Sequence, residues 1–308
     1  MITPMLSKLV DRLPATGDYL YEIKLDGQRT IAEVTSRSAI LYTRNLRNVT
    51  RKYPELVELP DCLRCKKATL DGEIVALKDG IPSFQQLQHR MSLSDARMIA
   101  VAAQQIPVLY YVFDLLELDG RSLLKMPLHE RKRLLTKSIL PGEVVKLLPS
   151  FDSRDITLRK ASKFGYEGVV AKKRDSPYYP GQRTTLWLKL KFQESDSFVI
   201  GGWLEGGRSH NFGSLLIGKY QGKKLMFRGR AGTGFNESTI SMLMDSFEGI
   251  KSQESPFEDL PKGPKGSHWL KPKLVADIKF KEVTSAGILR SPVYIGLRPD
   301  LRPEDCKL

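Results

Sequence analysis

A lysine that precedes an Asp-Gly pair is the first feature of this sequence that could do covalent chemistry. Residues 22–29 read EIKLDGQR, so Lys24 would end a strand and Asp26-Gly27 would turn the chain before Arg29. Alone, this pattern is typical of a hairpin with an exposed lysine, because Gly27 tolerates a positive φ. The alternative is a nucleophilic lysine at the rim of a nucleotide pocket, since a neutral amine can attack phosphorus.

Four further short motifs carry charged or aromatic side chains that suit such a pocket. Each has an ordinary structural interpretation when taken alone: a carboxylate beside a turn, a core aromatic residue, or lysines on the solvated face of a strand. The motifs are DGE with Glu73, FDLL with Phe113 and Asp114, EGVVAKK with Glu167 at a strand start, and WLKLK with Lys189 and Lys191 on one face.

Strands joined by tight turns must position these residues. The predicted strands are 19–25, 30–35, 39–43, 71–78 and 107–118, and the predicted helices are 82–91 and 127–139. Asp-Gly pairs at 26–27, 79–80 and 119–120 separate them. This alternation predicts an α+β domain of antiparallel sheets with helices packed outside, over residues 1–194.

A second set of short strands follows the segment 186–197 and predicts another domain, over residues 195–308. The predicted strands are 198–206, 214–222, 224–234 and 275–287, with a helix at 236–249 and a linker rich in Pro, Gly and Lys at 256–267. Short strands with one helix are typical of a small Greek-key barrel such as an OB-fold.

Composition indicates a soluble, basic protein. The 308 residues include 49 Lys and Arg against 35 Asp and Glu, a net charge of +14, which favours contact with a nucleic-acid backbone. The three cysteines suit a reducing cytosol, and the single CxxC at Cys62 and Cys65 does not predict a zinc site. The start of the chain lacks a secretory signal and no apolar run has membrane-spanning length. We therefore expect a cytoplasmic, nucleoid-associated location and no membrane contact.

The order of the motifs along the chain is more specific than any single motif. Lys-x-Asp-Gly-x-Arg, Asp-Gly-Glu, Phe-Asp, Glu-Gly-Val-Val and Lys-x-Lys together resemble the covalent nucleotidyltransferase superfamily of DNA ligases, RNA ligases and mRNA capping enzymes. Longer segments, among them LYEIKLDGQR, YYVFDLLELDG, EGVVAKKRDSPYYPGQRTTLWLKLK and RSPVYIGLRPD, are similar to bacterial ATP-dependent DNA ligases of the end-joining type. These are the ligase module of ligase D and its stand-alone relatives. The resemblance covers residues 4 to 300 and implies an ATP-grasp-like nucleotidyltransferase domain followed by an OB-fold.

The resemblance also implies a role for each motif residue. Lys24 would carry AMP, and a lysine amine must be neutral to attack although its ordinary pKa is about 10.4. Positive charge from neighbouring lysines and Mg²⁺ would lower that pKa and neutralise the transferring phosphate. The implied roles are adenine recognition by Glu22 and the backbone at Ile23, stacking by Phe113, AMP or nick-phosphate contact by Arg29, ribose contact by Glu73, ribose and 5′-phosphate contact by Arg44, α-phosphate contact by Lys189 and Lys191, metal binding by Glu167 with Glu73, and pyrophosphate orientation by Arg298 and Asp300.

The implied cofactors are ATP and Mg²⁺, with Mn²⁺ as a substitute, and the implied substrate is nicked or broken double-stranded DNA. A monomer is expected, and Ku is the usual partner of the family. One position departs from the family pattern: the last motif ends in Leu301 where the family has a lysine. Arg302 follows, but in an extended strand its side chain would lie on the opposite face. We therefore expect self-adenylation to be the step most impaired by this change.

Two other classes of function fit parts of the sequence. The same chemistry could act on RNA, in an RNA ligase or a capping-type enzyme that uses GTP. A non-catalytic nucleic-acid-binding protein with a vestigial nucleotide site is the second alternative. The joint presence of Lys24, Glu73, Glu167, Lys189 and Lys191 argues against the second.

Overall fold

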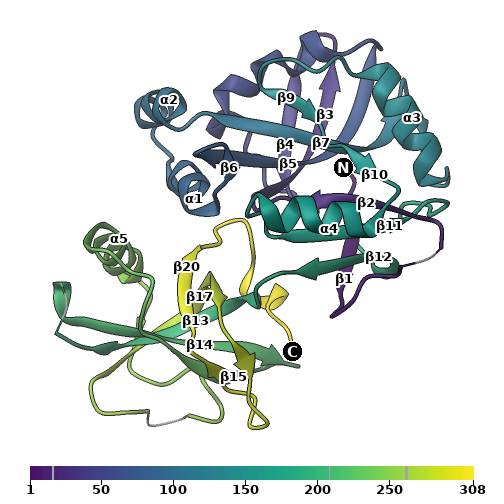
Figure 1. Ribbon diagram of the computed structural model, residues 1–308. Helices are drawn as coiled ribbons and strands as arrows, with labels where there is room; N and C mark the ends of the chain where they lie inside the picture. Colours follow the sequence, from purple (N-terminus) through teal and green to yellow (C-terminus); the bar gives the residue numbers. More distant parts are fainter. Residues whose placement is uncertain (16, 208, 261–262) are drawn as a thin grey trace. The chain divides into compact units, whose positions relative to one another are not determined.

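The computed structural model describes residues 1–15, 17–207, 209–260 and 263–308. It divides into two compact units, Met1–Phe192 and Gln193–Leu308 (Figure 1). The boundary between the units lies two residues before the boundary at 194/195 that the sequence predicts. No helix among these described residues is long and apolar enough to span a membrane. The two units are described separately below.

The first unit contains a five-stranded sheet in the order β1-β12-β11-β2-β10 (Figure 1). Neighbours in this sheet are antiparallel, as expected, except that β1 and β12 form one parallel pair. The strands are β1 (Leu6–Leu9), β2 (Tyr19–Lys24), β10 (Ser150–Phe151), β11 (Gly168–Lys173) and β12 (Arg183–Lys191).

A second sheet of the same unit has seven strands. Its main order is β4-β3-β5-β7-β8, with β6 on β5 and β9 parallel to β7. The strands are β3 (Gln28–Thr35), β4 (Ala39–Thr43), β5 (Lys67–Lys78), β6 (Ile81–Pro82), β7 (Val108–Leu118), β8 (Arg121–Ser122) and β9 (Val145–Leu147).

Helices pack on both sheets of the first unit. α1 (Phe84–Ser92) packs on β5, α3 (Leu128–Ser138) on β7, and α4 (Arg154–Lys163) on β2 and β11. The two helices expected from sequence are α1 and α3; α2 (Ala96–Gln105) and α4 were not expected. Side chains cap three of them at Ser83, Asp95 and Ser153, each accepting from a backbone N–H of the first turn. Short 3₁₀ turns, η1 (Thr50–Lys52) and η2 (Pro54–Cys62), lie between β4 and β5.

The three Asp-Gly pairs do not behave alike. The pairs at 79–80 and 119–120 close the hairpins β5–β6 and β7–β8, with positive φ at both residues of each pair, as two-residue turns require. The pair at 26–27 closes no hairpin, because β2 and β3 belong to different sheets. The hairpin expected around Lys24 was therefore wrong: the segment carries the chain from one sheet to the other.

Glycine is needed at position 27 for close packing, and its φ is not positive. A Cβ there would lie 2.3 Å from the carbonyl oxygen of Ile74 and 3.0 Å from Cγ of Glu73. The turn after Lys24 thus packs directly against the β5 strand that carries the DGE motif.

The second unit is a small antiparallel barrel with one helix. Its sheet has the order β15-β14-β13-β17-β16, with β20 paired to β17, and β18 and β19 form a separate two-stranded ribbon. The elements are β13 (Ser195–Glu205), η3 (Ser209–Asn211), β14 (Phe212–Gln221), β15 (Lys224–Ala231), α5 (Glu237–Phe247), β16 (Lys251–Ser252), β17 (Ser267–Lys279), β18 (Glu282–Val283), β19 (Leu289–Arg290), β20 (Val293–Leu297) and η4 (Pro303–Asp305).

This arrangement is the OB-fold expected from the sequence, with differences in the strands. The strand expected at 275–287 is the second half of β17, which begins at Ser267, followed by β18. The short strands β16 and β19 and the final strand, β20, were not expected. In the linker expected at 256–267, positions 261–262 lie outside the described residues.

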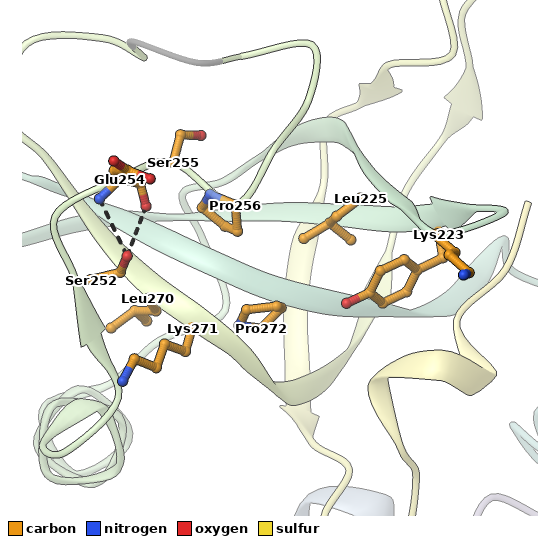
Figure 2. A pocket seen from close by; sticks show the side chains of 10 residues that line it. Lys223, Leu225, Ser252, Glu254, Ser255, Pro256, Leu270, Lys271 and Pro272 are labelled. Atoms are coloured by element: carbon orange, nitrogen blue, oxygen red, sulfur yellow. Dashed lines mark hydrogen bonds between the residues drawn. The ribbon is translucent and has the colours of Figure 1, made fainter.

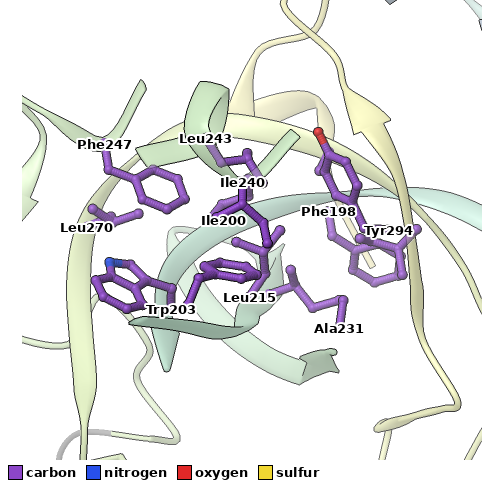
Figure 3. Packing of buried hydrophobic residues seen from close by; sticks show 14 of the residues in the cluster. Phe198, Ile200, Trp203, Leu215, Ala231, Ile240, Leu243, Phe247, Leu270 and Tyr294 are labelled. Atoms are coloured by element: carbon purple, nitrogen blue, oxygen red, sulfur yellow. The ribbon is translucent and has the colours of Figure 1, made fainter. Parts of the chain in front are cut away.

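Two apolar clusters hold the barrel together. The larger lies under α5 and includes Phe198, Ile200, Trp203, Leu215 and Leu243 (Figure 3). The smaller lies on the other face of the sheet, and Leu301 and Cys306 belong to it. Burial also raises the pKa of the Cys306 thiol to about 12. The C-terminal segment is therefore part of the hydrophobic core of the barrel.

A hollow of about 350 Å³ lies on the second unit (Figure 2). Tyr220, Lys223, Pro256, Lys271 and Pro272 contribute to its lining. None of the residues to which the sequence assigned a role lines it.

Candidate active site

The three adjacent strands β2, β11 and β12 direct alternate side chains to opposite faces of the sheet. On one face, Tyr21, Val169, Ala171, Leu188 and Leu190 pack into one apolar cluster with residues of α4. Side chains in between lie on the opposite face, because successive residues of a strand point to opposite sides. The period-two pattern thus separates the residues of the apolar cluster from the charged residues that the sequence singled out.

Strand register arranges the opposite face into three rows across β2, β11 and β12. Each row takes one residue from each strand. The rows are Lys24, Gly168 and Lys191; Glu22, Val170 and Lys189; and Leu20, Lys172 and Trp187. Ile23, whose backbone was expected to contact adenine, directs its side chain to the core cluster.

Glu167 joins the two lysines of the first row. Its Oε2 accepts a hydrogen bond from Nζ of Lys24 at 2.5 Å, and its Oε1 lies 2.9 Å from Nζ of Lys191. Burial alone would raise the pKa of the Glu167 carboxyl, but Lys24 and then Lys191 outweigh burial and lower it to about 2. Gly168 allows β11 and β12 to lie close together at this point, since a Cβ on residue 168 would lie 2.0 Å from the carbonyl oxygen of Leu190.

Glu22 lies deeper on the same face and is 2% exposed. Nζ of Lys172 on β11 lies 2.7 Å from its Oε2, and Nζ of Lys132 on α3 contacts its Oε1. Burial would raise the pKa of the Glu22 carboxyl, but Lys132 and Lys172 together hold it below its ordinary value. Burial also lowers the pKa of Lys172 to about 8, although Glu22 opposes that shift.

Phe113 of β7 is 6% exposed and belongs to a cation–π cluster. Nζ of Lys172 lies 4.1 Å from its ring centroid and 4.2 Å from that of Trp187. The guanidinium of Arg29 lies 4.5 Å from the Phe113 ring. This cluster places Phe113 of the seven-stranded sheet against Lys172 and Trp187 of the five-stranded sheet.

Arg29 is held by a carboxylate that was not singled out from the sequence. It donates two hydrogen bonds to Asp71, at 2.5 and 2.7 Å, and Tyr178 donates a third to Asp71 at 2.6 Å. Burial would lower the pKa of Arg29, but the neighbouring Asp71 raises it above its ordinary value. Arg29 is thus fixed in orientation before any ligand arrives.

The DGE motif lies inside β5, so the expectation of a turn beside Glu73 was wrong. Glu73 is paired in register with Arg29 on β3 and Tyr111 on β7, and it is partly exposed. Gly72 is needed there because a Cβ would lie 2.5 Å from the ring of Tyr110. Among the described residues, no group of three or more acidic, His or Cys side chains forms a ready-made metal site.

Arg44 lies in the turn that follows β4 and is partly exposed. Backbone hydrogen bonds from Thr43 N–H to Arg47 O and from Leu46 N–H to Thr43 O close this turn. Leu46 has a φ of 60°, which completes the tight turn around Arg44. The chain therefore presents Arg44 on a well-defined loop of the first unit.

Arg298 and Asp300 lie in the second unit, in the turn between β20 and η4. Arg298 donates to both oxygens of Asp300, at 2.9 and 2.8 Å, and to Asp277 at 2.7 Å. Leu301 is 8% exposed and packs in the smaller core cluster. Arg302 lies just before η4 and outside any strand, but its backbone is extended, with φ −100° and ψ 149°. Its side chain is exposed and contacts Asp305, whereas Leu301 is buried, so the two side chains differ as expected.

Sequence reasoning missed several residues that the fold brings together here. Lys132 and Lys172 contact Glu22, Asp71 binds Arg29, and Trp187 packs against Lys172. The register of β11 would have shown Lys172, since it lies two residues beyond Val170 on the same face. Lys132 comes from a helix and has no such signal.

Comparison with known proteins gives the family of this chain. Residues 4–191 match the family described as ATP dependent DNA ligase domain, and residues 208–301 match ATP dependent DNA ligase C terminal region. The multifunctional non-homologous end joining DNA repair protein LigD of Mycobacterium tuberculosis (strain ATCC 25618 / H37Rv) is 38% identical over 296 residues, which cover 94% of this chain and 37% of that protein. A DNA ligase of Thermococcus fumicolans is 31% identical and covers 94% of this chain and 53% of its own length.

The chain therefore spans little more than a third of the LigD proteins and about half of the archaeal ligase. Among solved structures, a mycobacterial DNA ligase D complexed with ATP and MES is 33% identical with a TM-score of 0.67, covering 99% of this chain and 97% of the solved chain. Because the first family match covers more than half of the sequence, this chain belongs to the ATP-dependent DNA ligases.

Proposed function

We propose that this chain seals nicks between a 3′-hydroxyl and a 5′-phosphate in duplex DNA, with ATP as the AMP donor. The observation that carries the proposal is the row Lys24, Gly168 and Lys191 with Glu167 between its two amines. The ligase D similar to this chain was solved with ATP, which supports ATP as the donor.

In the first step the neutral amine of Lys24 attacks the α-phosphorus of ATP. A P–N bond forms, the bond to the β-phosphate oxygen breaks, pyrophosphate leaves and the amine loses a proton. Lys189 and Lys191 lie on the same face of β12 and neutralise charge that develops on the α-phosphate. Arg298 and Asp300 orient the pyrophosphate.

In the second step an oxygen of the nick 5′-phosphate attacks the same phosphorus. A P–O bond forms, the P–N bond breaks and the lysine nitrogen regains a proton. In the third step the 3′-hydroxyl attacks the 5′-phosphorus, loses its proton and displaces AMP, which leaves a phosphodiester. Arg44 contacts the ribose and the nick 5′-phosphate.

Glu22 and Phe113 bind the adenine base. Glu22 accepts from the exocyclic amine, and Phe113 stacks on the ring together with Val170, which lies between Glu22 and Lys189 on the same face. Glu73 contacts the ribose. Arg29, already oriented by Asp71, contacts the AMP moiety or the nick phosphate.

Glu167 is suited to hold Mg²⁺, or Mn²⁺ in its place. Its carboxylate is ionised, and Mg²⁺ typically binds one or two carboxylates plus substrate phosphates and waters. Glu73 is the second candidate ligand. When bound, the ion would neutralise phosphate charge, while Lys24 and Lys191 act from the two sides of Glu167.

DNA would be bound mainly through its phosphates, given the net charge of +14. The similarity to an end-joining DNA repair protein, LigD, supports a role in the repair of broken ends. We further propose that the chain acts on the nucleoid, as a monomer recruited by a Ku-type partner.

The test is sealing of a nicked duplex with labelled ATP. The parent should form a protein–AMP adduct and join the strands, and Lys24→Ala should do neither. Lys173→Ala removes an exposed lysine of β11 and should behave as the parent. Failure of the parent to form the adduct would overturn the proposal. Nicks with ribonucleotides on one side or the other would distinguish an RNA ligase.

A further inference from the structure

Helix α3 carries two consecutive basic residues that reach two different sheets. Arg131 donates to both oxygens of Asp114 on β7, each at 2.8 Å, and both residues are fully buried. Lys132, the next residue, contacts Oε1 of Glu22 on β2 of the other sheet. One turn of helix therefore connects a strand of the seven-stranded sheet to a strand of the five-stranded sheet.

The two strands held in this way carry the proposed adenine contacts. Asp114 directly follows Phe113 on β7, and Glu22 is two residues before Lys24 on β2. Arg131 and Lys132 thus link the strand that carries the stacking ring to the strand that carries the carboxylate. Arg133 is an exposed basic residue of the same helix. Among the described contacts it pairs only with Glu130, one turn away on α3, and it contacts neither sheet.

Glu22 is prepared to accept hydrogen bonds. Two ammonium groups keep its carboxylate ionised at 2% exposure, one on each oxygen. Neither Oε1 of Glu22 nor Nζ of Lys172 forms a hydrogen bond of good geometry with the described residues. A ligand that donates to this carboxylate therefore meets an oxygen with acceptor capacity left.

An ionised carboxylate only accepts, so it distinguishes purines at position six. A six-amino group donates a hydrogen bond to the carboxylate. A six-oxo group is itself an acceptor, so the carboxylate repels it, and a purine with no substituent at position six has no donor there. Sites built to bind a donor discriminate strongly against analogues that lack it. We propose that Lys132 is the positioning residue that holds Glu22 toward the six-amino group, so that selection of the base depends on helix α3.

This inference rests on the proposed function, since it assumes that Glu22 reads adenine. The test measures the second-order rate constant of protein–AMP formation with ATP and with purine riboside triphosphate, which lacks the six-amino group. Four proteins are compared: the parent, Lys132→Met, Lys132→Arg and the control Arg133→Met. The ratio of the two rate constants is the readout, because it does not depend on the fraction of active protein.

Lys132→Met should lower the rate constant with ATP about tenfold or more, as expected for a misdirected hydrogen bond to a charged group. The rate constant with purine riboside triphosphate should stay within about twofold, so the ratio falls. Lys132→Arg should restore most of the ratio and Arg133→Met should leave it unchanged. In a Glu22→Gln background, Lys132→Met should not change the ratio further.

Equal losses with both nucleotides would overturn the inference, because Lys132 would then serve the fold alone. An unchanged ratio in Lys132→Met would also overturn it. If the parent forms no adduct with ATP, the proposed function itself fails, which is a different result from an adduct whose base preference ignores Lys132.

Discussion

Oε2 of Glu167 lies 2.5 Å from Nζ of Lys24, the amine proposed to carry AMP. The other oxygen of the same carboxylate lies 2.9 Å from Nζ of Lys191. One partly buried carboxylate thus contacts two amines from different strands. The geometry predicts that a substitution at Glu167 will change the positions of both amines, that of the nucleophile Lys24 and that of the neighbouring Lys191.

Replacing Lys191 with Met should slow protein–AMP formation about 100-fold or more, because one preorganised cation at the developing phosphate charge is lost. Rapid quench of the labelled adduct measures this rate. Lys8→Met, which removes an exposed lysine from β1 of the same sheet, is the matched control. A rate within about twofold of the parent would contradict the role of Lys191.

The ionised state of Glu167 should contribute to stability in a pH-dependent way. Lys24 and Lys191 outweigh burial and lower its pKa to about 2, from an ordinary value of 4.5. Because the pKa is lower in the folded state, the contribution is complete above pH 4.5 and is lost as pH falls toward 2. Urea unfolding of the parent and Glu167→Gln should show a stability difference at neutral pH that shrinks over this range. A difference that is constant with pH would contradict the assignment.

Asp114→Asn should lower the free energy of unfolding of the first unit by about 3–5 kcal/mol, since it leaves the fully buried Arg131 without its charged partner. Glu130→Gln breaks the exposed pair with Arg133 on the same helix and should change it by less than about 1 kcal/mol. Chemical denaturation measures both. Similar losses of unfolding free energy in the two variants would show that burial of the Asp114–Arg131 pair does not determine its contribution to stability.

Gly27→Ala should lower the free energy of unfolding by about 1–3 kcal/mol, because its methyl group would overlap the Ile74 carbonyl. It should also slow adduct formation, since the turn that follows Lys24 must shift. Gly232→Ala is the matched control, because its Cβ would meet only Ser214 Cβ at 3.8 Å. Normal stability and rate in Gly27→Ala would show that the turn can move without cost.

Leu301→Lys should lower the free energy of unfolding of the barrel by about 1–3 kcal/mol, because Leu301 lies in the smaller core cluster. Per folded molecule, we expect no faster adduct formation, since the amine would first have to leave the core. Leu301→Met conserves volume and should cost less than about 1.5 kcal/mol. Faster adenylation by the Leu301→Lys protein, with sealing of pre-adenylated nicks unchanged, would instead support the impairment expected from the sequence.

Periodicity was sufficient to predict β2, β3, β4, β5 and β7 of the first unit, but not its short strands β1, β6, β8, β9 and β10. β4 matches its expected range, and the hairpins at Asp79-Gly80 and Asp119-Gly120 follow from turn chemistry alone. The same rule misplaced Asp26-Gly27, because local sequence does not show whether the next strand pairs with the last one or joins another sheet. Only the register of β2 with β11 settles that question.

The motif residues on strands were easier to predict than the residues that hold them. Lys189 and Lys191 share a face because alternation is a local property. Lys132 and Asp71 are joined to Glu22 and Arg29 across long distances in sequence, which no spacing rule encodes. At Leu301 the sequence shows only the absence of the family's lysine, and the place of this residue in the smaller core cluster depends on tertiary packing.

The alternation on β2, β11 and β12 has a consequence for misfolding. A slip of one residue in any of these strands would turn its lysines toward the apolar cluster and its core residues to the opposite face. A misregistered sheet would lose its core and its nucleotide site together. The fraction of a preparation that accepts AMP should therefore equal the fraction with the native strand register, and active-site titration would serve as an assay of folding.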